Sequence, residues 1–303
     1  MSESTVPPSR WIRRAAIAFQ VIVATIAVLV ISGSLYLLAW LAFDPLTAEA
    51  WTTGLQPTLF QGDIDPDLQT FSDAAYGSVF GVAHNSGDSL QATLEALIYG
   101  ADVIEVDVVE IDGTLYSAHS SPLPFVGQEW FRGPRLDTIW TAAFGAEAVS
   151  LDLKESSPAF VRLVGEFLAT RAPYRQVIVT GRDSWVLADL RQQAPNAVYL
   201  LSVPDREFLD RELRDSTATR EIIDGVTIRE SALDDETIAW LGEQGLLVFA
   251  WTVNDLERVN ELIGLGVDGI TTDNLAILTL LGGQERGERE LYQSPPPGGD
   301  GAE

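Results

Sequence analysis

The chain has 303 residues, with 44 acidic side chains against 19 basic ones, a formal net charge of −25 and no cysteine. The acidity argues against a nucleic-acid partner, because phosphate backbones are bound by clustered Lys and Arg. The lack of cysteine excludes disulfides, thiolate metal ligands and a cysteine nucleophile. The length allows one large domain with additional segments.

The N-terminal part of the chain carries a long apolar run. Residues 15–43 contain no charged side chain, and Arg10, Arg13 and Arg14 precede them. A helix that crosses a bilayer needs about 20 apolar residues. We therefore predict a cytoplasmic N-terminus over 1–14 and a single transmembrane helix over 15–43. The positive-inside rule places the remainder outside the cytoplasm, which predicts a single-pass protein of the cell membrane.

A cleaved signal peptide is the alternative interpretation of this run. Ala48, Glu49 and Ala50 have the small-x-small pattern of a cleavage site. The apolar core of a signal peptide is about 7–15 residues long, however, and the run seen here is much longer. We favour the uncleaved anchor.

Two polar segments flank the remaining domain. Residues 44–76 are rich in Asp, Pro, Thr and Gln, and we predict an extracytoplasmic spacer there. Residues 283–303 combine consecutive prolines, glycines and charges, a composition that cannot bury a core, and we predict a disordered tail.

Residues 77–282 alternate between short β-branched runs and helical patterns. We predict strands near 79–83, 102–109, 148–152, 176–180, 197–202, 224–228, 246–252 and 268–271. We predict helices over 89–99, 136–144, 158–170, 184–193, 205–214, 231–243, 255–265 and 275–281. Eight strands alternating with helices favour an α/β fold, specifically a closed (β/α)8 TIM barrel. Ser231 and Asp255 are expected N-caps, and Gly100, Gly245 and Gly266 stand where helices should stop.

Barrels of this kind carry their catalytic residues at the carboxyl ends of the strands. His84 and His119 are the only histidines of the chain, and each follows an extended run. Imidazole titrates near neutral pH, so the two are candidates for an acid and a base. A lone histidine is more often structural, but two of them at strand ends favour a function.

Acidic residues also interrupt two strands that we expect to be buried. Glu105 and Asp107 are two positions apart and point to the same side of their strand, as do Asp152 and Lys154. Buried carboxylates are costly unless a cation compensates them, and a divalent ion with oxygen ligands does so. An outward-facing ladder of salt bridges is the structural alternative.

The ordered set of segments resembles the glycerophosphodiester phosphodiesterase family over residues 79–282. The similar segments are GVAH at 81–84, GADVIEVDV at 100–108, the run before His119, LDLK at 151–154, VFAWTVN at 248–254 and GVDGITTD at 266–273. The resemblance implies a (β/α)8 barrel that hydrolyses glycerophosphodiesters to glycerol phosphate and an alcohol, using a divalent metal.

The same resemblance implies a role for individual residues. By position, His84 and His119 are the acid/base pair. The implied metal ligands are Glu105, Asp107 and Asp152, which would hold Mg²⁺ or Ca²⁺. The implied substrate-binding residues are Asn85, Lys154, which would contact the phosphate, and Trp251, which would line the pocket.

The sequence departs from the family's pattern at several of these positions. Asn85 stands where the family usually has an arginine that grips the phosphate, and Ser120 where it usually has aspartate. Asp152 is one methylene shorter than the usual glutamate. Arg182 and Arg229 follow predicted strands and are candidates to replace the missing charge.

We therefore expect a membrane-anchored, metal-dependent phosphodiesterase that acts on glycerophosphodiesters or lysophospholipid headgroups, with a small-molecule or lipid phosphodiester as substrate. A phospholipase D-like or phosphoinositide-cleaving enzyme of the same fold is the enzymatic alternative. A catalytically degenerate surface protein that binds phosphodiesters is the alternative from another class, and the departures at Asn85 and Ser120 motivate it.

Overall fold

The structure is a computed structural model of the chain and describes residues 10–43, 59–64, 68, 69, 71, 73–118 and 132–282. It consists of two compact units, Met1–Ala50 and Trp51–Glu303. The first contains one helix, α1 (Arg10–Phe43), whose described side chains over residues 19–35 are all exposed. Among the described residues, no helix combines the length and the apolar character needed to cross a membrane.

Eight parallel strands of the second unit form a closed barrel. They are β1 (Phe80–Ala83), β2 (Val103–Ile111), β4 (Ala148–Leu153), β5 (Gln176–Gly181), β6 (Val198–Val203), β7 (Gly225–Arg229), β8 (Leu247–Trp251) and β9 (Gly269–Thr272). Each strand pairs with the next, and β1 pairs with both β2 and β9, which closes the ring. The predicted (β/α)8 barrel is confirmed, and each strand lies within two residues of its expected bounds.

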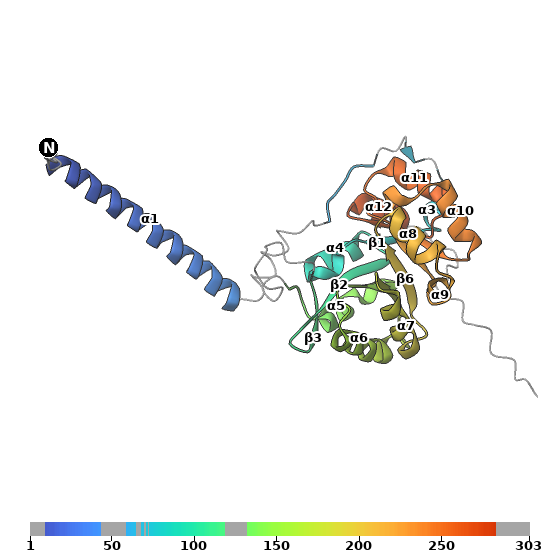
Figure 1. The fold of residues 1–303 in the computed structure, drawn as a ribbon. Helices are drawn as coiled ribbons and strands as arrows, with labels where there is room; N and C mark the ends of the chain where they lie inside the picture. The colour runs from blue at the N-terminus through green and yellow to red at the C-terminus, as the bar shows by residue number, and fades with distance from the viewer. Residues whose placement is uncertain are drawn as a thin grey trace, which may run out of the picture. The chain divides into compact units, whose positions relative to one another are not determined.

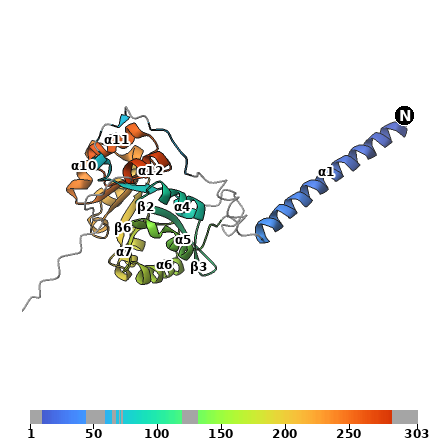
Figure 2. The ribbon, with the colours of Figure 1, turned by 180° about the vertical axis from the view of Figure 1, so that it is seen from behind.

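Helices cover the outside of the barrel (Figures 1 and 2). They are α3 (Asp73–Tyr76), α4 (Leu90–Ile98), α5 (Leu136–Ala142), α6 (Pro158–Arg171), α7 (Ser184–Gln193), α8 (Arg206–Leu209), α9 (Thr217–Arg220), α10 (Asp235–Glu243), α11 (Leu256–Leu265) and α12 (Leu275–Gly282). The helix predicted over 205–214 is α8 followed by a π-helical turn over Asp210–Arg214. A short strand, β3 (Thr114–Ser117), pairs antiparallel with the end of β2.

The helix ends follow the capping rules, with one correction. The Asp255 side chain accepts a hydrogen bond from the Arg258 N–H, which confirms it as the N-cap of α11. The predicted N-cap Ser231 is wrong, because residues 230–232 form a 3₁₀ turn. Asp234 caps α10 instead, since its carboxylate accepts from the Thr237 N–H three residues on. The glycines expected to stop helices, Gly100, Gly245 and Gly266, all have positive φ.

Two layers of apolar side chains result from the alternation along each strand. The larger layer lies between the strands and the helices. The smaller one fills the lower interior of the barrel with Phe80, Val82, Val103, Ala148, Ile178, Val198, Leu200 and Phe249. Side chains two positions further along the same strands point to the same side. The upper interior of the barrel is therefore where polar residues of these strands meet.

Candidate active site

A cavity of about 660 Å³ lies at the carboxyl ends of the barrel strands. Six of the predicted site residues line it, namely His84, Asn85, Glu105, Asp152, Lys154 and Trp251. The remaining two differ: Asp107 lies completely buried beside Lys154, and His119 falls outside the described residues. The structure thus brings together every predicted site residue that it describes.

The strand register explains why the carboxylates face inward. Val103 belongs to the interior layer of the barrel, so Glu105 and Asp107 on the same strand point inward as well. Asp107 is the register partner of Asp152 on β4. An outward-facing ladder of salt bridges is therefore ruled out for these residues.

Lys154 connects the two neighbouring carboxylates. Its Nζ lies 3.0 Å from Asp107 Oδ1 and also pairs with Asp152 Oδ2. Burial alone would lower the pKa of Lys154, but the charges of Asp107 and Asp152 outweigh it and raise this pKa. Burial raises the pKa of Asp107 to about 8, although the ammonium opposes this. Thr180 Oγ1 donates to Asp152 Oδ1 at 2.8 Å and fixes the second carboxylate.

The donor set suits a hard divalent cation in its chemistry, since Glu105, Asp107 and Asp152 supply oxygen ligands on two adjacent strands. Burial raises the pKa of Glu105, as it does for Asp107, so the pair calls for a compensating positive charge. In this arrangement Lys154 provides that charge to Asp107 and Asp152. Within the described ranges, no three His, Cys, Asp or Glu side chains are grouped so that they could hold a metal ion.

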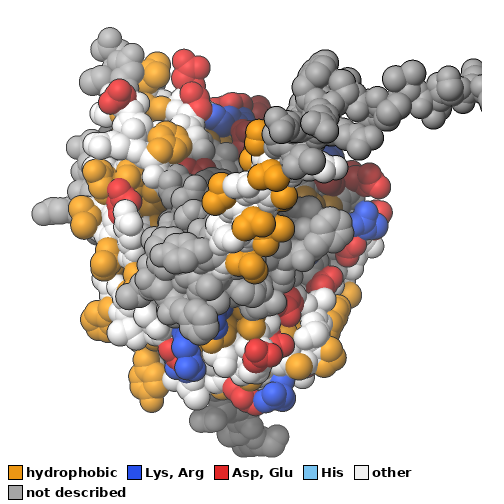
Figure 3. Space-filling model, turned by 90° about the vertical axis from the view of Figure 1, so that its left-hand side faces the viewer, with side chains coloured by type: hydrophobic (Ala, Val, Ile, Leu, Met, Phe, Trp, Pro, Cys, Tyr) orange, Lys and Arg blue, Asp and Glu red, His pale blue; other side chains and the backbone are white. Residues whose placement is uncertain are grey.

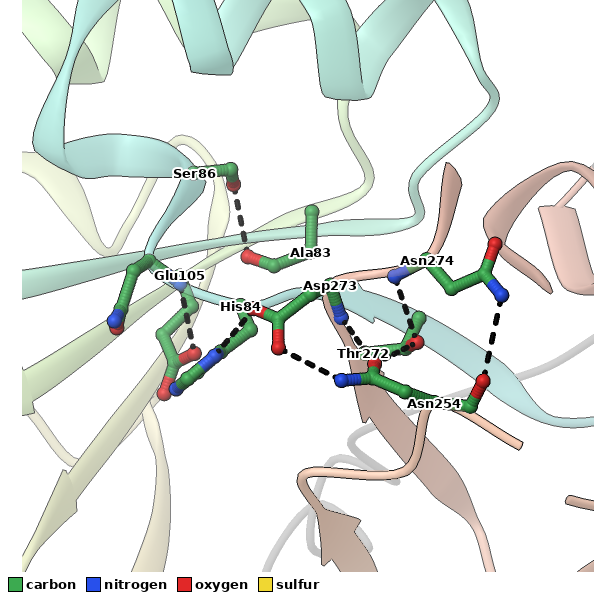
Figure 4. Close-up of polar contacts among 9 residues, drawn as sticks. Ala83, His84, Ser86, Glu105, Asn254, Thr272, Asp273 and Asn274 are labelled. Carbon is green, nitrogen blue, oxygen red and sulfur yellow. Dashed lines mark hydrogen bonds and ion pairs between the residues drawn. The ribbon is translucent and has the colours of Figure 1, made fainter. Parts of the chain in front are cut away.

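His84 extends from the end of β1 and is held on one side of its ring. Its Nδ1 lies 2.8 Å from Asp273 Oδ1 (Figure 4). Burial alone would lower the pKa of His84, but the hydrogen bond to Asp273 and the charges of Glu105 and Asp273 outweigh it and raise the pKa to about 9. His84 is therefore an imidazolium at neutral pH in this arrangement.

Asn85 has a backbone role that an arginine does not match well. Its φ is +51°, in the left-handed region, which asparagine tolerates better than most residues. The Asn85 N–H donates to Glu105 Oε2 at 3.3 Å. The turn after β1 thus directs a backbone donor, and no side-chain cation from this position, toward the carboxylates.

Two arginines line the same cavity, Arg182 after β5 and Arg229 at the end of β7. The Arg229 guanidinium lies over the Trp251 ring, 4.9 Å from its centroid. Many other basic side chains of the barrel form ion pairs with carboxylates, and on the face shown in Figure 3 Lys and Arg lie beside Asp and Glu. Among the described residues, neither Arg182 nor Arg229 has a carboxylate partner. Both remain available to an anion in the cavity.

Three residues of the site received no role from the sequence. Asp273, which follows β9, contacts His84, and Asn254, which follows β8, donates a hydrogen bond to Asp273. The rule that strand ends carry function would have selected both. Asp88 lies in the turn after β1, and its Oδ1 accepts from the Asp107 N–H at 3.0 Å. Burial and the charge of Asp107 raise the pKa of Asp88 well above its usual range.

Residues 143–277 match the sequence profile of the glycerophosphoryl diester phosphodiesterase family. Over this segment, which is less than half of the chain, the protein resembles that family. It is also similar to YhdW of Bacillus subtilis, which its name assigns provisionally to the glycerophosphodiester phosphodiesterases, with 34% identity over 85 residues. That match covers 28% of this chain and 33% of the relative, so the chain matches about a third of the relative's length.

Solved structures of similar proteins share the fold. A protein from Silicibacter pomeroyi, which its description assigns provisionally to the glycerophosphoryl diester phosphodiesterases, superimposes with a TM-score of 0.56 at 21% identity, over 68% of this chain and 93% of that one. A phosphodiesterase from Oleispira antarctica, in complex with the product sn-glycerol-3-phosphate, superimposes with a TM-score of 0.55 at 19% identity, over 68% and 98%. At these identities the likeness shows the barrel fold.

Proposed function

We propose that the protein hydrolyses glycerophosphodiesters, releasing a glycerol phosphate and an alcohol. The observation that carries this proposal is the cavity at the carboxyl ends of the strands, which is lined by the His84 imidazole, by carboxylates that include Glu105 and Asp152, and by three cationic side chains. The Oleispira antarctica relative is described with sn-glycerol-3-phosphate, a product of such a reaction. Lysophospholipid headgroups contain the same glycerophosphodiester unit and are further substrates in this proposal.

The residues of the chain divide the work of hydrolysis between them. Lys154, Arg182 and Arg229 bind the phosphoryl oxygens and stabilise the charge that grows on them. An oxygen nucleophile attacks phosphorus as the bond to the leaving oxygen breaks. The nucleophile is water, or it is the substrate's own glycerol hydroxyl, in which case water then opens the cyclic phosphate to glycerol phosphate. The His84 imidazolium gives its Nε2 proton to the leaving alkoxide. His119 takes the proton of the nucleophile, and Trp251 lines the substrate pocket.

A divalent cation, Mg²⁺ or Ca²⁺, is part of this proposal. Glu105, Asp107 and Asp152 would hold it, and when bound it would polarise the phosphoryl group. Their positions on the adjacent strands β2 and β4 support this, as does the raised pKa of Glu105 and Asp107.

Asn85 stands where the family usually has a phosphate-binding arginine. In this proposal Arg182 and Arg229 supply the positive charge in its place. Both line the cavity, and neither has a carboxylate partner among the residues described. An arginine that stacks on an aromatic ring keeps its guanidinium N–H groups free to bind phosphate. The Arg229–Trp251 contact therefore supports a phosphate-binding role for Arg229.

The first prediction tests the reaction and its metal dependence together. The purified full chain should hydrolyse glycerophosphocholine or glycerophosphoethanolamine, lose most activity in EDTA and regain it with Mg²⁺ or Ca²⁺. Product formation is measured by coupled detection of glycerol phosphate. Binding of these compounds without turnover, at any metal concentration, would favour a degenerate binding protein.

A panel of substrates also distinguishes the proposed activity from the two enzymatic alternatives. Lysophospholipids, intact phosphatidylcholine and phosphoinositides are offered alongside the glycerophosphodiesters. Preferred cleavage of the intact phospholipids would replace our proposal with the phospholipase D-like or phosphoinositide-cleaving alternative. The double variant Arg182→Ala/Arg229→Ala tests the phosphate contacts, since loss of two contacts that hold the phosphoryl oxygens and stabilise their growing charge should raise KM and lower kcat.

We also propose that residues 15–43 anchor the protein in the cell membrane, with the barrel on the extracytoplasmic side. The uncharged run and the three arginines before it support this proposal. Protease added to intact spheroplasts should then digest the barrel and leave a cytoplasmic marker protein whole. Survival of the barrel until lysis would contradict the orientation. A mature protein lacking residues 1–50 would favour the signal peptide.

A further inference from the structure

The two ends of the barrel sequence meet beside the catalytic histidine. β1 and β9 are parallel neighbours, and Ala83 on β1 is the register partner of Thr272 on β9. The next residue along each strand is His84 on one side and Asp273 on the other. The His84 N–H also donates to the Thr272 carbonyl at 3.1 Å. The pairing of first and last strands thus sets the distance between the imidazole and the carboxylate.

The Asp273 carboxylate uses its two oxygens for different partners, as Figure 4 shows. Oδ1 lies 2.8 Å from His84 Nδ1, and Oδ2 accepts from Asn254 Nδ2 at 2.9 Å. Burial alone would raise the pKa of Asp273, but the hydrogen bond and charge of His84 outweigh it and lower this pKa. An ionised carboxylate only accepts hydrogen bonds, so His84 Nδ1 must carry the proton.

Asn254 is itself held in one orientation. Its Oδ1 accepts from the Asp273 N–H at 2.8 Å and from Thr272 Oγ1 at 2.9 Å. Because both of these groups donate, this atom must be the amide oxygen, and the NH₂ group must face Asp273. Thr272 Oγ1 accepts in turn from the Asn274 N–H at 3.0 Å. The loops after β8 and β9 together fix the carboxylate.

We infer that Asp273, oriented by Asn254, is the positioning residue of His84. It keeps the proton on Nδ1 and leaves Nε2 as the nitrogen that serves the cavity. A carboxylate on the far side of a catalytic imidazole fixes the tautomer and stabilises the imidazolium. That His84 acts in catalysis rests on the proposed function. The orientation and tautomer of its imidazole can be tested without any turnover.

The test uses ¹⁵N-histidine-labelled full-length protein, in which only two imidazoles give signals. His119→Ala assigns them. In the wild type without metal, His84 should titrate with a midpoint near pH 9 and become the Nδ1–H tautomer when neutral. Asp273→Asn should lower that midpoint by a pH unit or more, although Glu105 and Asp107 still raise it, and should populate the Nε2–H tautomer. Asn254→Ala should shift it in the same direction by less.

Kinetics provide the second readout. Asp273→Asn should lower kcat by about tenfold to a hundredfold with little change in KM, and Asp273→Glu should restore part of the rate. Asp268→Asn is the matched control at the opposite end of β9, where the carboxylate accepts a hydrogen bond from the Val248 N–H at 2.8 Å. This control should lower the melting temperature but leave the His84 midpoint, its tautomer and kcat unchanged.

The outcomes separate this inference from the proposed function. An unchanged midpoint and tautomer in Asp273→Asn overturn the inference, as does an unchanged kcat in an active enzyme. If Asp273→Asn and Asp268→Asn lose kcat equally, Asp273 is only structural and the inference also fails. Should the imidazole respond as expected while the wild type hydrolyses no phosphodiester, the positioning of His84 stands and the proposed function fails.

Discussion

Replacing His84 with alanine is expected to lower kcat for a glycerophosphodiester by about a hundredfold or more. His84 lines the cavity, and its raised pKa keeps it protonated at neutral pH, ready to give a proton to the leaving alkoxide. His119→Ala should cost a similar factor if it is the base. The losses should not multiply in the double variant, because residues that act as a unit are not additive.

A change of leaving group identifies which histidine is the acid. p-Nitrophenolate needs no proton to leave, so a p-nitrophenyl substrate should restore the rate of His84→Ala but not that of His119→Ala. In metal-free protein, the stabilising effect of the His84 charge is fully present below about pH 6.5 and is lost as pH rises through 9. Wild-type rates in both single variants would end the acid/base assignment.

Replacing Lys154 with methionine is expected to have the largest effect on stability. Asp107 is fully buried, and its carboxylate would lose the ammonium 3.0 Å away. Breaking a buried ion pair by removing one partner costs about 3 kcal/mol or more. For a domain of this size that corresponds to a drop in melting temperature of roughly 6–12 °C. Thermal unfolding followed by circular dichroism measures it, at about pH 9, above the raised pKa of Asp107, where its carboxyl is ionised.

Two comparisons make the Lys154 result specific. Arg206→Met removes one partner of the exposed pair with Asp234 and should cost under about 1 kcal/mol. Asp107→Asn added to Lys154→Met should recover part of the stability, because it removes the uncompensated charge. If Glu105, Asp107 and Asp152 hold a divalent cation, millimolar Mg²⁺ or Ca²⁺ should also raise the melting temperature of Lys154→Met. A melting temperature equal to that of the wild type would show that Lys154 does not compensate Asp107.

The barrel could be predicted from the sequence because its signals are local. Each strand is a short β-branched run, and glycines such as Gly100 and Gly266 stop the preceding helices. The sequence does not locate the start of α10, because Ser231 and Asp234 are both good caps and only the connection from β7 decides between them. The π-helical turn after α8 has no signal of its own in the residue pattern.

The site could be predicted where a residue's position on its own strand decides its direction, or where it stands at a strand end. Glu105 and Asp107 share a strand, so their common direction follows from the period of two. The contact between His84 and Asp273 depends instead on the pairing of β1 with β9 that closes the barrel. No local sequence pattern predicts this pairing. The pairing of Lys154 with Asp107 likewise depends on the register of β2 and β4.

The His84–Asp273 contact joins residues 189 positions apart, at the outer ends of the barrel sequence. During synthesis the histidine emerges early, but its carboxylate arrives only with the final strand. β1 and β9 are joined by four register pairs. Any local unfolding that separates these two strands also separates His84 from Asp273, even while the other strands remain paired. Enzymatic activity therefore requires the closed barrel. During refolding, activity should recover later than the helical circular dichroism signal.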